Sequence, residues 1–305
     1  MAKARAIVKR RKAVRNIRKI TKTMQMIATA KFQKALKRAV AAKPYSRKTR
    51  ELVGELASSI GDIEHPLLRR PGAAESAHRI ALLVITSNRG LAGAYNGSIL
   101  RTCHKFLEKE KAASTQIDLY VCGKKGVNYF NFQKLPITQR FDQFGDAPKY
   151  DLVAEVADQF IARFVKGEVD AVHVAYMNFA SAGSQKPEVL TLLPLSDIAA
   201  AKPERSKAET SKPDAPHYNA IYDFYPDAKS LLDELLPLTV KTTLFQCFLD
   251  ATTSENIARM IAMKSATDNA DKMVKSLTMR YNHARQSQIT TELSEIMGGV
   301  EAMKS

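Results

Sequence analysis

The sequence lacks the features of several familiar protein classes. Its three cysteines, Cys103, Cys122 and Cys247, are too few and too widely spaced for a disulfide framework or a zinc site, so we expect ordinary thiols in a reducing compartment. No run of about 18 apolar residues occurs, and no segment is therefore expected to span a bilayer. The charged N-terminus is not followed by the apolar stretch of a signal peptide, which predicts a protein that is neither exported nor inserted.

Motifs that would indicate catalysis are also missing. The six histidines form no i, i+4 pair and no HExxH, and there is no GxSxG, so we predict no catalytic residue, no metal and no cofactor. The glycine-rich loop Ser87–Ile99 has neither GxGxxG nor the ending of a P-loop. We interpret it as a tight crossover, in which Gly90 and Gly93 allow close backbone packing. Arg89 and Asn96 would tether this loop.

Acidic residues are missing from the first fifty positions, which contain 18 lysines and arginines. This segment holds all of the excess behind the net charge of +16, because the remaining chain has a charge of −2. It favours an acidic partner, which could be a nucleic acid, an anionic membrane surface or a protein that presents carboxylates. Nucleic-acid binding usually needs aromatics among the basic residues, and only Phe32 and Tyr45 are aromatic here. A merely solvated helix face is the plain alternative.

The segment 1–60 has the composition of a long helix, since Ala, Lys, Arg, Met and Gln dominate and Pro44 is its one proline. Apolar and small residues recur in alternating steps of three and four, the pattern of a coiled coil. The predicted seam consists of Val14, Ile17, Thr21, Met24 and Ala28, with Ile20 and Ile27 beside it.

The segment 226–303 repeats this helical character, and Pro237 interrupts it. Its predicted seam consists of Met260, Met263, Thr267, Ala270, Val274, Leu277, Tyr281 and Ala284. The next apolar stripe begins five residues after Ala284 and therefore points in another direction. Its members are Ile289, Leu293, Ile296, Val300 and Met303. Fraying of the last turns and a functional change of face both remain open.

The sequence between the two helical segments has a different pattern, in which strand-like and helix-like stretches alternate. The stretches 79–87, 116–123 and 169–177 are rich in β-branched and aliphatic residues and predict strands, and 188–195 predicts a final one. Helical stretches near 98–111 and 152–166 alternate with them, which favours an α/β domain over 76–198. A proline-containing polar segment follows and predicts a linker over 199–220.

Four ordered stretches of this sequence resemble the gamma subunit of F-type ATP synthases over nearly the full length. They are KITKTMQMIATAKFQKA (19–35), SNRGLAGAYN (87–96), ARMIAMKSATDNADKM (258–273) and YNHARQSQITTELSEI (281–296). The resemblance implies a long antiparallel coiled coil of the N- and C-terminal helices with an inserted Rossmann-like α/β domain. This fold class, a mixture of α+β and α/β character, agrees with the alternating strand-like and helical stretches described above.

The resemblance also implies a function without catalysis. The coiled coil would be the rotor shaft inside a head of α and β subunits. The α/β domain and the lower coil would sit on the membrane c-ring, with the epsilon subunit alongside. Rotation of the asymmetric shaft would then drive the catalytic β subunits through their states. No nucleic acid would be bound, and membrane association would come through partners only, at the cytoplasmic face of a bacterial membrane.

The resemblance assigns partner-binding roles to individual positions. Met24 would lie near an acidic lever loop of β, with Arg259 approaching that region from the other helix. Lys19 and Lys22 would meet carboxylates of β or of epsilon. Two groups at the end of the chain complete the set: Arg285, Gln286 and Thr290 around a polar catch on β, and Ile289, Leu293, Ile296 and Val300 in an apolar sleeve.

Two positions depart from the family pattern, which commonly has Asp at position 88 and Cys at position 92. Here they are Asn88 and Ala92, so an ion pair between position 88 and Arg89 is in doubt.

Two other functions remain as alternatives. One is a basic coiled-coil protein that binds nucleic acid, and the other is an α/β enzyme that uses a nucleotide.

Overall fold

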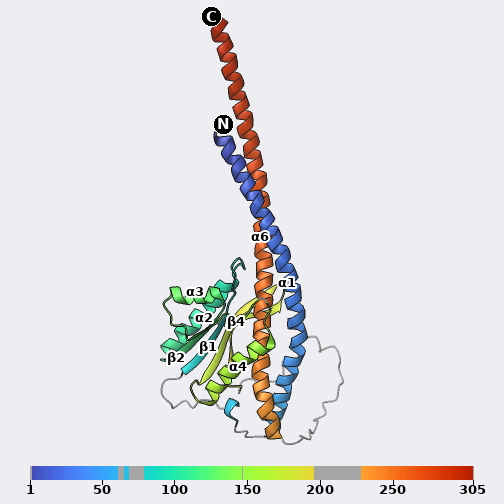
Figure 1. Ribbon diagram of the computed structural model, residues 1–305, viewed down its shortest axis with the longest axis vertical. Coiled ribbons are helices and arrows are strands. Elements are labelled where there is room, and N and C mark those ends of the chain that lie inside the picture. Colours follow the sequence, from blue (N-terminus) through green and yellow to red (C-terminus); the bar gives the residue numbers. More distant parts are fainter. Residues whose placement is uncertain (1, 61–64, 69–78, 146, 196–227, 305) are drawn as a thin grey trace. The chain divides into compact units, whose positions relative to one another are not determined.

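The computed structural model describes residues 2–60, 65–68, 79–145, 147–195 and 228–304. The chain divides into two compact units, of which one combines Met1–Lys31 with Asn256–Ser305 and the other is Phe32–Glu255. The elements in chain order are α1 (Ala2–Ile60), η1 (Pro66–Leu68), β1 (Arg79–Ile85), α2 (Tyr95–Ala112), β2 (Gln116–Cys122), α3 (Lys124–Phe132), β3 (Gln139–Phe141), α4 (Tyr150–Val165), β4 (Ala171–Ser181), β5 (Ser184–Leu193) and α6 (Ala228–Lys304) (Figure 1). The predicted linker over 199–220 lies outside the described residues.

The helix α6 continues through Pro237, so the predicted interruption at this residue is wrong. Proline removes one backbone hydrogen bond and crowds the preceding turn, which ordinarily kinks or ends a helix. Here Leu232, Leu236 and Val240 are fully buried on either side of it. Their packing stabilises the helical conformation, because most helical stability in proteins comes from a buried face.

The first unit is an antiparallel coiled coil made by the start of α1 and the second part of α6 (Figure 1). Val14, Thr21 and Ala28 of α1 are buried at intervals of seven residues. Between Met260 and Ala284 the buried residues of α6 are all members of the predicted seam, namely Met263, Thr267, Ala270 and Leu277. Steps of three and four on α6 therefore do place one continuous face against α1.

Two of the five residues predicted for the seam on α1 are wrong. Ile17 and Met24 have 52% and 37% of their surface exposed and do not line the interface. Arg11 is half-buried three residues before Val14, and its guanidinium lies 5.0 Å from the centre of the Tyr281 ring. A long arginine stem can cover an apolar surface while its charged end reaches a partner, so it can replace an aliphatic residue here.

Two polar contacts cross the coiled coil. The Thr267 hydroxyl donates a hydrogen bond of 2.8 Å to the Thr21 hydroxyl, and both residues are buried. Arg18 forms an ion pair with Asp271 one turn away. Polar pairs at seam positions fix the register of a coiled coil, because a shift would leave buried polar groups without partners.

The second unit contains a five-stranded sheet in the order β3-β2-β1-β4-β5. All neighbours are parallel except β4 and β5, which are antiparallel. Right-handed crossovers place α2 and α3 on one face and α4 on the other (Figure 1). The first turns of α6 share the face of α4, since Leu236, Val240 and Leu244 pack in one core with Val153 and Phe160. The predicted fold class is confirmed by this arrangement.

The sequence prediction missed three short elements, η1, α3 and β3, and displaced one strand. α3 and the three-residue strand β3 are too short to show a periodicity. The last strand was expected at 188–195, but β5 runs over Ser184–Leu193 and contains Pro187. An edge strand tolerates proline, because its outer backbone groups have no neighbouring strand to bond.

Candidate functional site: the outer faces of the long helices

The first unit presents an apolar stripe on the outer face of α1. Its members are Ile17, Ile20, Met24 and Ile27, and all are exposed. Their spacing of three and four places them on one side of the helix, away from the buried seam. Lys19 and Lys22 are exposed beside the stripe, in a helix segment that has no acidic residue. The arrangement suits a partner that is apolar at its centre and acidic at its edge.

A second exposed apolar stripe lies at the end of α6. Its members are Ile289, Leu293, Ile296 and Val300. The helix continues without a break to Lys304, so the stripe is helical throughout. Within this unit α6 extends past the start of α1, so the stripe has no helix packed against it (Figure 1). Exposed apolar stripes of this length in water mark an interaction surface.

Gln286 and Thr290 lie one turn apart on α6, immediately before this stripe, and both are exposed. The Thr290 hydroxyl donates to the Gln286 carbonyl at 3.0 Å, so its oxygen lone pairs can still accept a hydrogen bond from a partner. The neighbouring Arg285 is also exposed. Arg259 lies half-buried lower on α6, well separated along the helix from these three residues. The predicted partner-binding residues thus form separate groups along the two helices.

The loop between β1 and α2 is held by its own side chains. Asn96 accepts a hydrogen bond of 3.0 Å from the Ser87 amide and donates one of 2.8 Å to the Ser87 hydroxyl. That hydroxyl in turn donates to the Arg89 carbonyl at 2.7 Å. Gly93 has a φ of 55°, in the left-handed region that favours glycine, and Gly90 packs against the Lys125 side chain. These contacts define a crossover fixed from within.

The departure at position 88 has a structural reason. The Asn88 amide nitrogen donates to the Phe144 carbonyl at 2.9 Å, and its oxygen accepts from the Lys124 amide at 3.2 Å. An ionised aspartate could accept the second bond but could not donate the first. Asn88 therefore joins three loops at the carboxyl end of the sheet without needing a charge.

A small cavity of about 30 Å³ lies at this carboxyl end, where open α/β sheets often bind nucleotides. Its lining includes Arg89 and, from α6, Phe248, Thr252 and Glu255. The volume accommodates about one water molecule and is far too small for a nucleotide. This region therefore gives no support to the nucleotide-using alternative.

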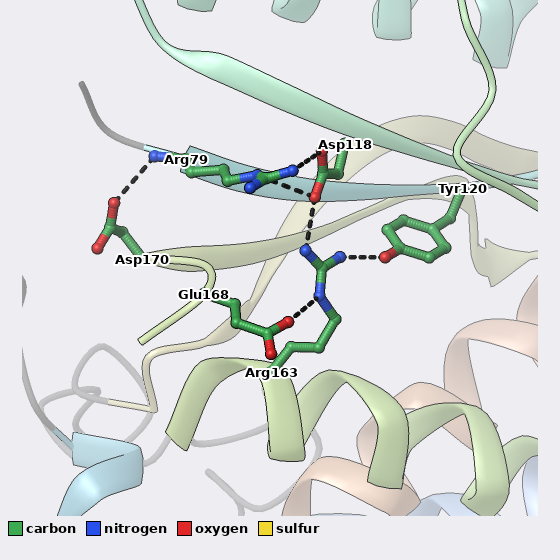
Figure 2. Close-up of polar contacts among 6 residues, drawn as sticks. All are labelled: Arg79, Asp118, Tyr120, Arg163, Glu168 and Asp170. Carbon is green, nitrogen blue, oxygen red and sulfur yellow. Dashed lines mark hydrogen bonds and ion pairs between the residues drawn. The ribbon is translucent and has the colours of Figure 1, made fainter. Parts of the chain in front are cut away.

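The opposite end of the sheet carries a polar network that the sequence analysis missed (Figure 2). Asp118 accepts hydrogen bonds from Arg79 at 3.1 and 3.2 Å and from Arg163 at 2.7 Å. Burial would raise the pKa of Asp118, but the two guanidinium groups outweigh it and hold this pKa below its ordinary value. Arg163 also donates to the Tyr120 hydroxyl and, at 3.0 Å, to Glu168. The network joins β1, β2 and α4 and has a structural role.

Two other kinds of site are not found in the part of the chain that the structure describes. No group of three or more His, Cys, Asp or Glu side chains there could hold a metal ion. No helix within the described ranges is long and apolar enough to cross a membrane. What the described residues do present is two exposed apolar faces on the coiled coil of the first unit and a five-stranded α/β sheet in the second. This combination is typical of a non-catalytic subunit of a larger assembly.

Comparison with known proteins gives this class a name. A family model described as ATP synthase matches residues 3–303, and the chain belongs to this family as one of its gamma chains. The ATP synthase gamma chain of Rhodopirellula baltica is 44% identical over 304 residues and covers 100% of both chains. That of Leptospira biflexa is 39% identical over 303 residues, covering 99% of this chain and 100% of its own. The predicted resemblance is confirmed, and the function is that of the non-catalytic central shaft.

Solved structures support the same fold. The rotor of the Euglena gracilis mitochondrial ATP synthase contains a chain with a TM-score of 0.66 at 17% identity, covering 94% of this chain and 99% of that one. The central stalk and c-ring of the Tetrahymena thermophila enzyme contain another, with a TM-score of 0.54 at 19% identity and coverages of 81% and 99%. At these identities the similarity concerns the fold alone.

Proposed function

We propose that this chain is the rotor shaft of a bacterial F-type ATP synthase, with specified faces of its coiled coil turning against the catalytic head. The α and β subunits would surround the coiled coil, and the α/β body would rest on the c-ring with the epsilon subunit alongside. The chain would be peripheral, held at the cytoplasmic face of the membrane by its partners. The single observation that carries this proposal is the pair of exposed apolar stripes on a register-fixed coil.

The proposed working parts follow the division of the sequence. The helices 1–60 and 226–303 would form the shaft, and 76–198 would form the body, with 199–220 as a linker. A shaft must contact its surroundings in every orientation without binding tightly in one of them. Narrow apolar stripes with charged neighbours meet this requirement, because a modest buried area keeps each contact weak.

The stripe on α1 would face an acidic loop of β. Lys19 and Lys22 would pair with carboxylates of this β loop or of the epsilon subunit. Met24 would be the apolar residue of the stripe that lies near the loop. Arg259 would approach the same region from α6. Exposed ion pairs of this kind contribute about 0–1 kcal/mol each, which suits contacts that must form and break.

The end of α6 would enter the top of the head. Gln286 and Thr290, with Arg285 beside them, would form a catch that hydrogen-bonds to β. Ile289, Leu293 and Ile296 would turn in an apolar sleeve, where non-directional contacts allow rotation. Unlike a hydrogen bond, apolar contact does not depend on orientation, so the stripe can guide the shaft while the catch holds it.

Met24→Lys tests the placement of the α1 stripe. The new ammonium group would add an ion pair with the acidic loop in some rotary states only, stabilising them by about 1 kcal/mol, or roughly fivefold in a rate. We expect ATP-driven ion pumping to fall more than ATP hydrolysis, while assembly stays normal. Both activities are measured on the same membranes that contain the complete synthase.

Met26→Lys is the matched control, because Met26 is also exposed but lies on a different side of α1. It adds the same charge two residues away and should leave pumping and hydrolysis in their normal ratio. An unchanged ratio in Met24→Lys, or an equal loss in both variants, would show that the stripe does not face this loop.

A further inference from the structure

A buried carboxylate lies where α6 packs between α1 and the sheet, within the unit Phe32–Glu255. Asp250 has 4% of its surface exposed, although aspartate is rarely buried without an ion-pair partner. Its carboxylate accepts one hydrogen bond, of 2.9 Å, from the neutral side-chain amide of Gln246. Among the described residues no cationic group forms an ion pair with it. The carboxylate is therefore poorly compensated when it is ionised.

The cations near this junction are directed elsewhere. The Lys43 ammonium donates to the Phe179 carbonyl at 3.2 Å. The Arg50 guanidinium donates to the hydroxyl of Thr243 at 3.3 Å, and Thr243 lies about 10 Å from Asp250 along α6. Lys43 acts on Asp250 through its charge alone, without a direct contact.

A second carboxylate near the junction is already provided with donors. Glu188 of β5 accepts hydrogen bonds from the Tyr176 hydroxyl and, at 3.1 Å, from the Asn178 amide. The charge of Glu188 opposes ionisation of Asp250. The titratable groups around Asp250 are thus Lys43 and Arg50 from α1, Tyr176 from β4, Glu188 from β5 and Cys247 from α6 itself.

The amide next to Asp250 shows the same shortage of donors. Gln246 is more than nine-tenths buried, and its side-chain oxygen has no hydrogen-bond partner within the described residues. Its nitrogen is engaged by Asp250, so this amide supplies the carboxylate with its one bond. A proton on Asp250 would remove a buried charge and add a donor beside an acceptor that has none.

From this geometry we propose that Asp250 is a proton-binding site, and that the bound proton strengthens the packing of α6 against α1 and the sheet. Burial, more than any charge nearby, raises the pKa of Asp250 from 3.8 to about 6, and Lys43 and Gln246 limit the rise. One turn further along α6, Ser254 contacts the Met177 carbonyl of β4 at 3.5 Å. Deprotonation would therefore loosen α6 at the position where it lies against the sheet.

The direction of the pH effect follows from this pKa. Because the folded chain holds the proton up to about pH 6 and the unfolded chain releases it near 3.8, the folded chain binds more protons between these values. Stability from this group is present at low pH and is lost as the pH rises through about 6. Between pH 5 and 7.5 the opening constant should rise roughly tenfold through Asp250 alone.

Hydrogen exchange of residues 243–254 in the full chain measures this opening constant, after correction for the intrinsic pH dependence of exchange. Asp250→Asn replaces the protonated carboxyl by a neutral group of the same shape. In the wild type the opening constant should be roughly tenfold larger at pH 7.5 than at pH 5, whereas in Asp250→Asn this tenfold change should be absent. Asp158→Asn is the control, since Asp158 is exposed and paired with Lys241 on the surface. The opening constant of Asp158→Asn should show the same pH dependence as that of the wild type.

A second measurement does not depend on the stability of the variant. In carbon-13 spectra of chain labelled at aspartate carboxyl groups, the resonance absent from Asp250→Asn should titrate near pH 6. A resonance that titrates below about pH 4.5, or parallel exchange profiles of wild type and Asp250→Asn, would overturn the proposal. Neither measurement involves rotation, so the outcome is independent of the rotor function.

Discussion

Gly123→Ala is expected to destabilise the α/β body by about 4 kcal/mol, from a strained backbone and a direct overlap. Gly123 has a φ of 94° and follows β2 at the start of α3. A Cβ there would lie 2.2 Å from the carbonyl oxygen of Thr86. Thr86 cannot move away, because its amide and hydroxyl both donate to the Cys122 carbonyl, at 2.9 and 2.8 Å. Urea unfolding of the isolated chain measures the change in free energy.

Gly167→Ala separates the two causes of this loss. Gly167 also has a positive φ, of 72°, but a Cβ at this position would meet nothing within 4 Å. Its replacement should therefore cost only the backbone strain, about 1 kcal/mol. Equal losses in the two variants would mean that the contact between Gly123 and Thr86 is not as close as described.

Replacement of both Gln286 and Thr290 by alanine is expected to slow steady-state ATP hydrolysis by the assembled complex roughly tenfold. Each hydrogen bond to β would contribute about 0.5–1.5 kcal/mol, and a tenfold change in rate corresponds to about 1.4 kcal/mol. Alanine is the better helix former, so circular dichroism of the isolated subunit should show no loss of helix. Turnover is measured at equal amounts of assembled complex.

The chain offers a closely matched control for this pair. Ser287 and Thr291 are exposed with the same spacing, and the Thr291 hydroxyl donates to the Ser287 carbonyl at 2.9 Å, as Thr290 does to Gln286. They point about 100° further around the helix. Their replacement by alanine should leave hydrolysis nearly unchanged. Normal turnover in Gln286→Ala/Thr290→Ala, or an equal loss in the control pair, would reject the catch.

The long helices could be predicted from sequence because their periodicity extends over many turns. The seam of α6 was correct for this reason, but only three of the five residues predicted for the seam of α1 are buried. Apolar periodicity cannot show that Arg11 is half-buried or that Arg18 pairs across the coil, since their places depend on Tyr281 and Asp271 of the other helix. Where a charged residue has its partner far along the chain, local pattern assigns it to the surface.

The sheet was predictable in its long strands and not in its order. The strand β1 is a run of aliphatic residues, whereas β3 has three residues and depends on its pairing with β2.

Two buried acidic residues could also have been predicted from their sequence neighbours. Asp118 lies within QIDLYVC, and Asp250 follows the apolar run LFQCFL. An acidic residue within such a run indicates either a buried ion pair or a perturbed pKa.

The partner-binding residues could not be derived from the chain alone. The physical pattern identifies two exposed stripes, but which surface each one meets is a property of another protein. Gln286 and Thr290 look like any polar pair on a helix, and only the resemblance distinguishes them from Ser287 and Thr291. Their roles therefore stay predictions until the variants are measured in the complex.

Rotation of the chain within the head is the most direct test of the shaft function. A cysteine in place of the exposed Lys109 on α2 can carry a bead, because burial raises the pKa of Cys103 and Cys122 to about 12 and also raises that of Cys247. With the α and β subunits fixed to a surface, the bead should turn in one direction when ATP is added, at a rate that follows hydrolysis. Hydrolysis of ATP by the head while the bead stays still would contradict the account.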